Sequence, residues 1–379
     1  MINLKGIAWN HTRGFTSVVA TAQRFEELNP DIRITWEKRS LQAFADASLN
    51  DLVNNYDLLI MDNPHVSIAA KDKLLLPFDD YLSVEFINEL AENSVGKSHA
   101  SYHVYNKQWT LATDAATPIA TWREDLISKQ NIQIPKTWEE LLELTKTGNV
   151  AFASIPIDTL MHHYMLCIAL GGDVFEGKTE VAPRHIMIGA IKTYKALVDL
   201  APSYCLEMNP IKIYERMTQT NDIVYSPFNY GYSNYSKKNY ADHTLKAGGL
   251  VTFKGKRLRS TLGGAGIAVS SKTKYAEIAM KYAEFTALEK TQSGLYFEFG
   301  GQPGHRKAWL NDEVNNQCKD FFKDTLQTLD EATMRPQYYG YMHFQDEASP
   351  VIHEAVSGKV SIEAAVDKMN AIYRESLTH

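Results

Sequence analysis

The chain has 379 residues, of which 44% are hydrophobic and 22% are charged, with a formal net charge of −6 at pH 7. This is an ordinary globular composition, and the length suits two domains or one large two-lobed body. The acidic balance argues against nucleic-acid binding, which needs a basic face, and no apolar run reaches the roughly 18 residues of a membrane span.

The chain opens directly on a predicted strand, without the basic and apolar regions of a secretory leader. We therefore expect either a periplasmic or extracellular protein whose leader has been removed, or a cytoplasmic protein if the chain is native. The three cysteines cannot form a disulfide framework, and no zinc-type Cys/His spacing accompanies them. We expect buried free thiols, no metal and no cofactor.

The first third of the chain alternates predicted strands with predicted helices. Apolar runs predict strands over residues 4–9, 32–37 and 58–61, and apolar residues at helical spacing predict helices over 15–28 and 41–53. Open α/β sheets bind ligands at the carboxyl ends of their strands. Strand ends are therefore the first place to look for a binding site.

Each of these strands ends in side chains that can stack, hydrogen-bond or carry charge. Taken singly, the polar ones could be solvated loop residues, but their shared position at strand ends favours a site. The candidate ligand-binding residues of this part of the chain are Trp9, His11, Arg13, Arg39, Asp62 and His65.

Residues 109–126 connect this first pattern to a second one. The runs TLATD and PIATW read as extended segments separated by small residues, and a helix is expected to start near Arg123. A chain that leaves one lobe as a strand and enters another as a strand is a hinge. Asp114, at this crossing, could accept donors from a ligand or could fix the hinge by accepting backbone N–H groups. Beyond it, Thr137 and Glu140 predict a capping box at a helix start.

A set of segments runs in a fixed order over nearly the whole chain. They are FEELNPDIRITWE, YDLLIMD, LLPFDDYL, TWREDL, PKTWEELLEL, GGDVF, AIKTYKALVDLAP, GGAGIAVSSKTKYAEIAMKYAEFTA and SGKVSIEAAVDKMNAIY. In order and spacing they resemble the family 1 extracellular solute-binding proteins of ABC transporters, the maltose-binding-protein-like group.

The resemblance implies an α/β, two-lobed periplasmic-binding-protein-like fold, in which each lobe is a mixed sheet flanked by helices and the ligand sits in an interlobe cleft. The expected bounds are 1–112 and 262–311 for lobe 1, 115–259 and 312–379 for lobe 2, and hinge crossings near 113–114, 260–262 and 311–312.

Residues 222–235 are unusually rich in tyrosine and asparagine. A short apolar strand in this segment is expected to run into a loop dense in tyrosine and asparagine. Tyrosine offers a flat apolar face and a hydroxyl, and asparagine offers both a donor and an acceptor. Tyr225, Asn229 and Tyr230 are therefore candidate contacts to a neutral or mixed ligand, with ordinary core tyrosines as the alternative.

The later part of the chain adds four candidates, namely Gly264, Gly301, Gln302 and Tyr339. The GGAG run at residues 263–266 is not followed directly by a helix, so we reject a phosphate-binding loop. Tyr338 and Tyr339 resemble the iron-ligating pair of ferric-ion-binding relatives, but no carboxylate set accompanies them, which favours an aromatic cleft wall. The adjacent His162 and His163 point about 100° apart on a helix and make a poor metal pair.

We therefore predict the substrate-binding protein of an ABC importer, a monomer that captures a small polar solute by hinge closure and delivers it to a membrane permease. A carbohydrate or carbohydrate-like solute is implied by the family, and the basic side chains at the first strand ends favour an acidic group on it. The alternatives are a leaderless cytoplasmic small-molecule sensor on the same fold and an uncharacterised enzyme. We expect no catalytic residues, because no GxSxG, HExxH, P-loop or kinase motif occurs.

Overall fold

The chain passes several times between two structural units. The computed structural model describes residues 1–40 and 48–379. Unit 1 consists of residues 1–116, 232–234 and 262–317, and unit 2 of residues 117–231, 235–261 and 318–379. The chain therefore changes unit at 116/117, 231/232, 234/235, 261/262 and 317/318. Crossings were expected near 113–114, 260–262 and 311–312, and the short return of residues 232–234 to unit 1 was not expected.

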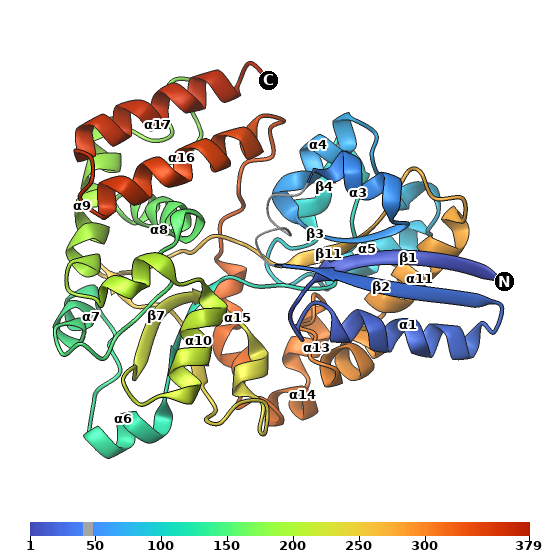
Figure 1. Ribbon diagram of the computed structural model, residues 1–379, viewed down its shortest axis with the longest axis horizontal. Helices are drawn as coiled ribbons and strands as arrows, with labels where there is room; N and C mark the ends of the chain where they lie inside the picture. The colour runs from blue at the N-terminus through green and yellow to red at the C-terminus, as the bar shows by residue number, and fades with distance from the viewer. Residues whose placement is uncertain (41–47) are drawn as a thin grey trace. The chain divides into compact units, whose positions relative to one another are not determined.

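A four-stranded sheet forms the centre of unit 1 (Figure 1). Its strands are β1 (Ile2–Trp9), β2 (Ile32–Arg39), β3 (Leu58–Asp62) and β11 (Ala265–Val269), in the order β11-β3-β1-β2. The first three are parallel, as the alternation of strands and helices predicted, and β11 is antiparallel to β3. Successive residues of β3 point to opposite faces of the sheet. Leu58 and Ile60 belong to one hydrophobic cluster and Leu59 and Met61 to another, so both faces of the sheet are buried.

Helices cover both faces of this sheet. On one face α1 (Thr16–Leu28) and α11 (Ala276–Ala287) pack on Leu58 and Ile60, and on the other α3 (Leu49–Asn55) and α4 (Val66–Lys71) pack on Leu59. The other elements of unit 1 are α5 (Val84–Glu92), β4 (His103–Val104), β5 (Lys107–Gln108), α12 (Glu289–Thr291), α13 (Arg306–Leu310) and α14 (Asp312–Asn316). Most of the predicted helix 41–53 lies outside the described residues.

Unit 2 contains a three-stranded antiparallel sheet with β6 (Pro118–Trp122) between β7 (Tyr225–Tyr230) and β8 (Lys246–Gly248). A strand is present within residues 222–235, as predicted, but it is β7 and runs through part of the tyrosine- and asparagine-rich stretch that we expected to be a loop. Pro227 is tolerated there since β7 is an edge strand, and its pairing with β6 shifts register around Ala120.

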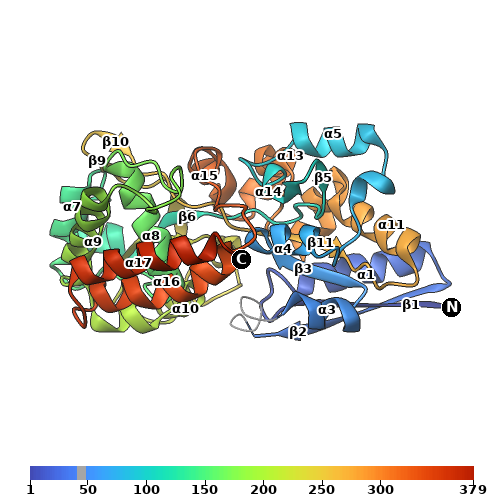
Figure 2. The ribbon, with the colours of Figure 1, turned by 90° about the horizontal axis from the view of Figure 1, so that it is seen from above.

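Helices and one short two-stranded sheet make up most of the rest of unit 2. Near its C-terminus, α16 (Tyr341–Val356) and α17 (Ile362–Ser376) run side by side and pack near α8 and α9 (Figure 2). The remaining elements are α6 (Glu124–Gln130), α7 (Trp138–Thr145), α8 (Pro156–Ala169), α9 (Arg184–Val198), α10 (Pro210–Gln219), β9 (Thr252–Phe253), β10 (Lys256–Arg257) and α15 (Phe321–Asp330). The predicted capping box at the start of α7 is confirmed.

Two further sequence-based expectations can be compared with this structure. Cys167, Cys205 and Cys318 are buried thiols that form no disulfide with one another, as expected. Among the described helices, none combines the length and the apolarity that crossing a membrane requires.

Candidate functional site

The carboxyl ends of β1, β2 and β3 meet at one edge of the unit 1 sheet. Trp9 lies beside Arg39 in the parallel register of β1 and β2, and the Asn10 N–H donates to the Arg39 carbonyl at 2.7 Å. On the other side of β1, β3 ends at Asp62, which is paired with Ala265 of β11. The structure therefore brings these predicted site residues to one edge, as the strand pattern indicated.

A tight turn follows β3 at this edge. The Asp62 carboxylate accepts a hydrogen bond from the Asn63 N–H at 2.8 Å and so caps the 3-10 turn Asn63–His65. The cap uses one carboxylate oxygen and fixes the direction in which the side chain leaves the strand. His65 closes the same turn, so the two predicted residues of this loop are held by one local structure.

Arg13 and Asp114 bind each other inside unit 1. The Arg13 guanidinium lies 4.6 Å from the Tyr232 ring centre and 5.9 Å from that of Trp9. Burial by itself would lower the pKa of Arg13, but the charge and hydrogen bonds of Asp114 raise it above its ordinary value. Arg13 thus stays charged, and its charge is matched within the unit.

His11 lies in the same loop and is neutral. Its ring meets that of Tyr232 edge-on at 4.7 Å, and its Nδ1 accepts a hydrogen bond from the Arg13 N–H at 3.0 Å. Burial, and then the Arg13 charge, lower the pKa of His11 to about 3. Neither side chain therefore presents an uncompensated positive charge at pH 7, which argues against the acidic ligand group that the sequence favoured.

Gly264, Gly301 and Gln302 pack segments of unit 1 together. Gly264 has a φ of +99°, and a Cβ there would lie 2.5 Å from the Asp114 carbonyl oxygen. A Cβ at Gly301 would lie 2.3 Å from the Tyr296 ring. The Gln302 amide donates to the Ala115 carbonyl at 2.8 Å and accepts from the Ser233 N–H at 2.9 Å. Contact with a ligand remains a prediction for these three residues.

The unit 2 candidates Tyr225, Asn229 and Tyr230 all lie on β7. The side-chain oxygen of Asn229 accepts a hydrogen bond from the Ala153 N–H at 2.7 Å. The side-chain nitrogen, Nδ2, has no hydrogen-bond partner among the described residues. Tyr225 is buried and pairs with Trp122 of β6. Tyr339 lies elsewhere in the chain, in the turn that leads into α16.

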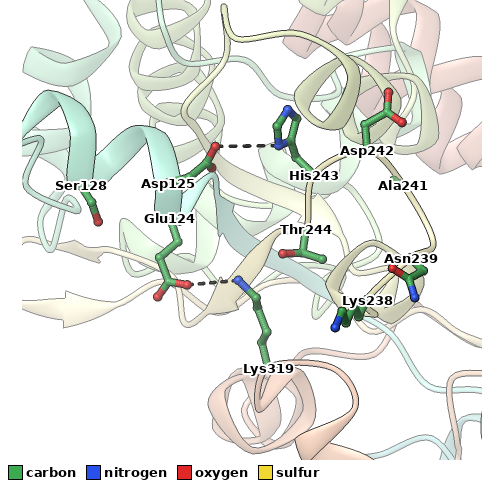
Figure 3. Close-up of a pocket in the computed structure, with 10 residues that line it drawn as sticks. All are labelled: Glu124, Asp125, Ser128, Lys238, Asn239, Ala241, Asp242, His243, Thr244 and Lys319. Carbon is green, nitrogen blue, oxygen red and sulfur yellow. Dashed lines mark hydrogen bonds and ion pairs between the residues drawn. The ribbon is translucent and has the colours of Figure 1, made fainter.

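A solvent-open groove of about 450 Å³ lies on unit 2. Figure 3 shows two pairs of side chains in it, Lys319 with Glu124 at 3.1 Å and the His243 ring with Asp125 at 3.9 Å. Exposed pairs of this kind contribute little energy. We assign no ligand to this groove.

A family model described as "Bacterial extracellular solute-binding protein" matches residues 8–293, which are 286 of the 379 residues. The chain belongs to this family. The resemblance inferred from the ordered sequence segments is therefore confirmed.

Solved structures agree with the family in fold. Maltose-bound MalE3 of T. maritima is similar at 16% identity, with 99% of this chain and 100% of that chain covered and a TM-score of 0.85. A Thermotoga lettingae ABC transporter solute-binding protein bound with α-D-tagatose is similar at 17% identity, with 100% of both chains covered and a TM-score of 0.84. A solute-binding protein of Agrobacterium radiobacter in complex with ribitol follows at 16% identity, with 99% and 98% covered and a TM-score of 0.83.

These likenesses confirm the two-lobed periplasmic-binding-protein-like α/β fold for this solute-binding protein. The family and the similar structures are described as binding proteins, and the family as extracellular.

The sequence patterns missed one polar cluster of this solute-binding protein, at the start of α8. The Tyr194 hydroxyl donates to the Ser154 hydroxyl at 2.8 Å and lies 2.9 Å from His162 Nδ1. Asp158, in the first turn of α8, is buried, and burial raises its pKa to about 7. The sequence did contain a signal for this cluster. Residues 150–154 pair with β7 through Val150 and lead into helix α8, as each strand of the unit 1 sheet leads into a polar strand end.

Proposed function

We propose that this protein is the substrate-binding component of an ABC importer, and that its solute is a neutral polyhydroxy compound, a carbohydrate or a polyol. The observation that carries the proposal is the pair of polar strand-end side chains of unit 1, Arg39 and Asp62, in a member of the solute-binding family. Similar structures hold maltose, tagatose and ribitol, which are all polyhydroxy compounds.

The chemistry of these side chains suits such a solute. A carboxylate such as Asp62 accepts hydrogen bonds from hydroxyl groups, and a guanidinium such as Arg39 donates to them. Trp9 is buried in the core of unit 1, so its predicted contact with a sugar ring is not part of this proposal. A neutral solute is favoured because His11 is neutral and because Asp114 compensates the charge of Arg13. His11 and Arg13 therefore do not require an anionic partner.

The proposed mechanism is closure of the two units around the solute. A solute that contacts both units binds the closed form more tightly, so it shifts the population toward that form by its differential affinity. The proposed partner is a membrane permease that distinguishes the loaded from the empty protein, and the proposed setting is outside the cytoplasm. We propose that the protein works as a monomer with no catalytic step.

A thermal-shift panel tests this function. Neutral monosaccharides, maltooligosaccharides and polyols form one arm, and sugar phosphates and uronic acids form the other. We expect at least one neutral compound to raise the melting temperature, and Asp62→Asn, which retains a capping side chain, to weaken its binding by about 1–3 kcal/mol. Asp31→Asn, at an exposed position of unit 1, is the matched control. Stabilisation only by the anionic arm would refute the neutral solute, and stabilisation by neither arm would count against solute binding.

A further inference from the structure

We propose that His343, Glu375 and His379 form a binding site for a divalent transition-metal ion of the zinc type in unit 2. Their ligand atoms lie within 4.8 Å of one another. His343 comes from the first turn of α16, Glu375 from the last turn of α17, and His379 from just beyond that helix. None of the three is among the predicted solute contacts.

The spacing along α17 places two of these ligands together. Glu375 and His379 are four residues apart, and the chain stays coiled after α17 ends, because the Thr378 N–H donates to the Glu375 carbonyl at 2.9 Å. Side chains four residues apart in a helical turn lie on one face. The His343 ring then faces both, with its Nε2 3.5 Å from a Glu375 carboxylate oxygen and its ring centre 4.4 Å from that of His379.

The backbone holds the two helix ends together before any metal binds. Gly340, at the start of α16, lies so close to Ser376 that a Cβ would come within 1.8 Å of the Ser376 carbonyl oxygen. The Tyr338 hydroxyl also lies 2.8 Å from the Ser376 hydroxyl. His343 and Glu375 are therefore presented by a closely packed junction, and such support makes a metal site more selective.

One nitrogen atom of this cluster, His343 Nε2, has no hydrogen-bond partner among the described residues. It is shielded from solvent, and it lies at ion-pair distance from Glu375. Buried polar atoms without a partner are rare and require an explanation. A metal ion between the imidazole and the carboxylate would satisfy this nitrogen and the carboxylate together.

The ligand set selects the class of metal. Two imidazole nitrogens and one carboxylate oxygen suit Zn²⁺ and similar transition metals, whereas Mg²⁺ and Ca²⁺ prefer oxygen ligands. Bonds of about 2.0–2.1 Å around a tetrahedral ion place its ligand atoms roughly 3.4 Å apart. Glu375 and His379 are exposed, so their side chains can rotate and bring the ligand atoms from their present separation to this shorter distance. Three protein ligands leave a fourth position for water.

Calorimetric titration of the tag-free protein with ZnCl₂ tests the site. We expect saturable binding of one ion, and at least about tenfold weaker binding in each of His343→Asn and Glu375→Gln, since each removes one of three ligands. His185→Asn, which changes an exposed histidine of α9, should bind as the wild type does. Melting curves without metal show whether each variant is folded.

Titration with CoCl₂ supplies a second readout that does not depend on stability. Tetrahedral coordination should give visible absorption bands in the wild type, and these bands should be lost in His343→Asn. Equal zinc affinity in the wild type and in His343→Asn, or no saturable binding by the wild type, would overturn the site.

Discussion

Arg13 and Asp114 are 101 residues apart in the sequence and form a two-point ion pair inside unit 1. Arg13 Nε donates to Asp114 Oδ2 at 2.7 Å, and Arg13 Nη2 donates to Oδ1 at 2.5 Å. The two side chains are only 5% and 1% exposed. Asp114 also accepts a hydrogen bond from the Ala265 N–H at 3.2 Å. Asp114 therefore accepts a backbone N–H, as one of its two predicted roles requires, and contact with a ligand stays a prediction.

Removing Arg13 should strongly destabilise the protein. Arg13→Ala leaves a carboxylate buried without its partner, which costs about 3–5 kcal/mol. Urea unfolding at pH 7 measures the loss. Arg24→Ala, which removes an exposed ion pair with Glu27, should change the free energy of unfolding by less than about 1 kcal/mol. Equal effects of the two substitutions would contradict the importance of the buried pair.

Several buried histidines should make the protein sensitive to acid. Burial lowers the pKa of His162 and His163 to about 3 and that of His99 to about 4. In the unfolded chain each of them binds a proton near pH 6.5. Between that pH and the lowered pKa the unfolded state holds more protons, so stability falls as the pH falls through this window.

His163 offers the cleanest test of this linkage, because within residues 1–40 and 48–379 its ring has one hydrogen-bonding neighbour, Cys167 Sγ at 3.5 Å. His163→Met should remove up to about 1.4 kcal/mol per pH unit from the acid slope of stability between pH 6.5 and pH 4. Urea unfolding at a series of pH values measures the slope. The exposed variant His185→Asn should keep the wild-type slope, and a matching slope in His163→Met would show that the buried ring does not titrate as expected.

Asp158 should act in the opposite direction. Burial raises its pKa to about 7, so the folded protein retains a proton that the unfolded chain loses above about pH 4. Its contribution to stability is therefore lost as the pH rises from about 4 to 7. Asp158→Asn cannot ionise, so its stability relative to the wild type should increase by up to about 1.4 kcal/mol per pH unit in that window. The exposed Asp173→Asn should show no such trend, and a pH-independent difference for Asp158→Asn would refute this explanation.

Gly264 should tolerate no side chain. Gly264→Ala combines an unfavourable φ with a Cβ only 2.5 Å from the Asp114 carbonyl oxygen, so we expect a loss of about 2–4 kcal/mol in the free energy of unfolding. Gly177→Ala, whose Cβ meets nothing within 4 Å, should change stability by less than about 1 kcal/mol. If Gly264→Ala unfolds at the same urea concentration as the wild type, the close approach at this glycine is not a constraint.

Local patterns in the sequence were enough to predict much of the fold. The three parallel strands, the capping box of Thr137 and the gathering of Trp9, Arg39 and Asp62 at one edge all depend on neighbouring residues and on the geometry of a sheet. The pairing of Arg13 with Asp114 could not be predicted, because no local pattern links residues 101 positions apart.

Two features were not predicted from the sequence, the extent of strand β7 and the polar cluster at the start of α8, and they were missed for different reasons. In β7, pairing with β6 outweighs the turn preference of Pro227 and Asn229, and an edge position with irregular register accommodates the proline. At α8, the titration of Asp158 depends on its burial, which spacing alone does not reveal. The hinge positions and the contacts to a solute stay predictions.

Small-angle X-ray scattering of the protein, with and without a solute that raises its melting temperature, tests the central claim that two units close on a polyhydroxy solute. We predict that the radius of gyration falls as the solute is added and levels off at the concentration that saturates the thermal shift. Identical scattering curves for the empty and the saturated protein would contradict closure.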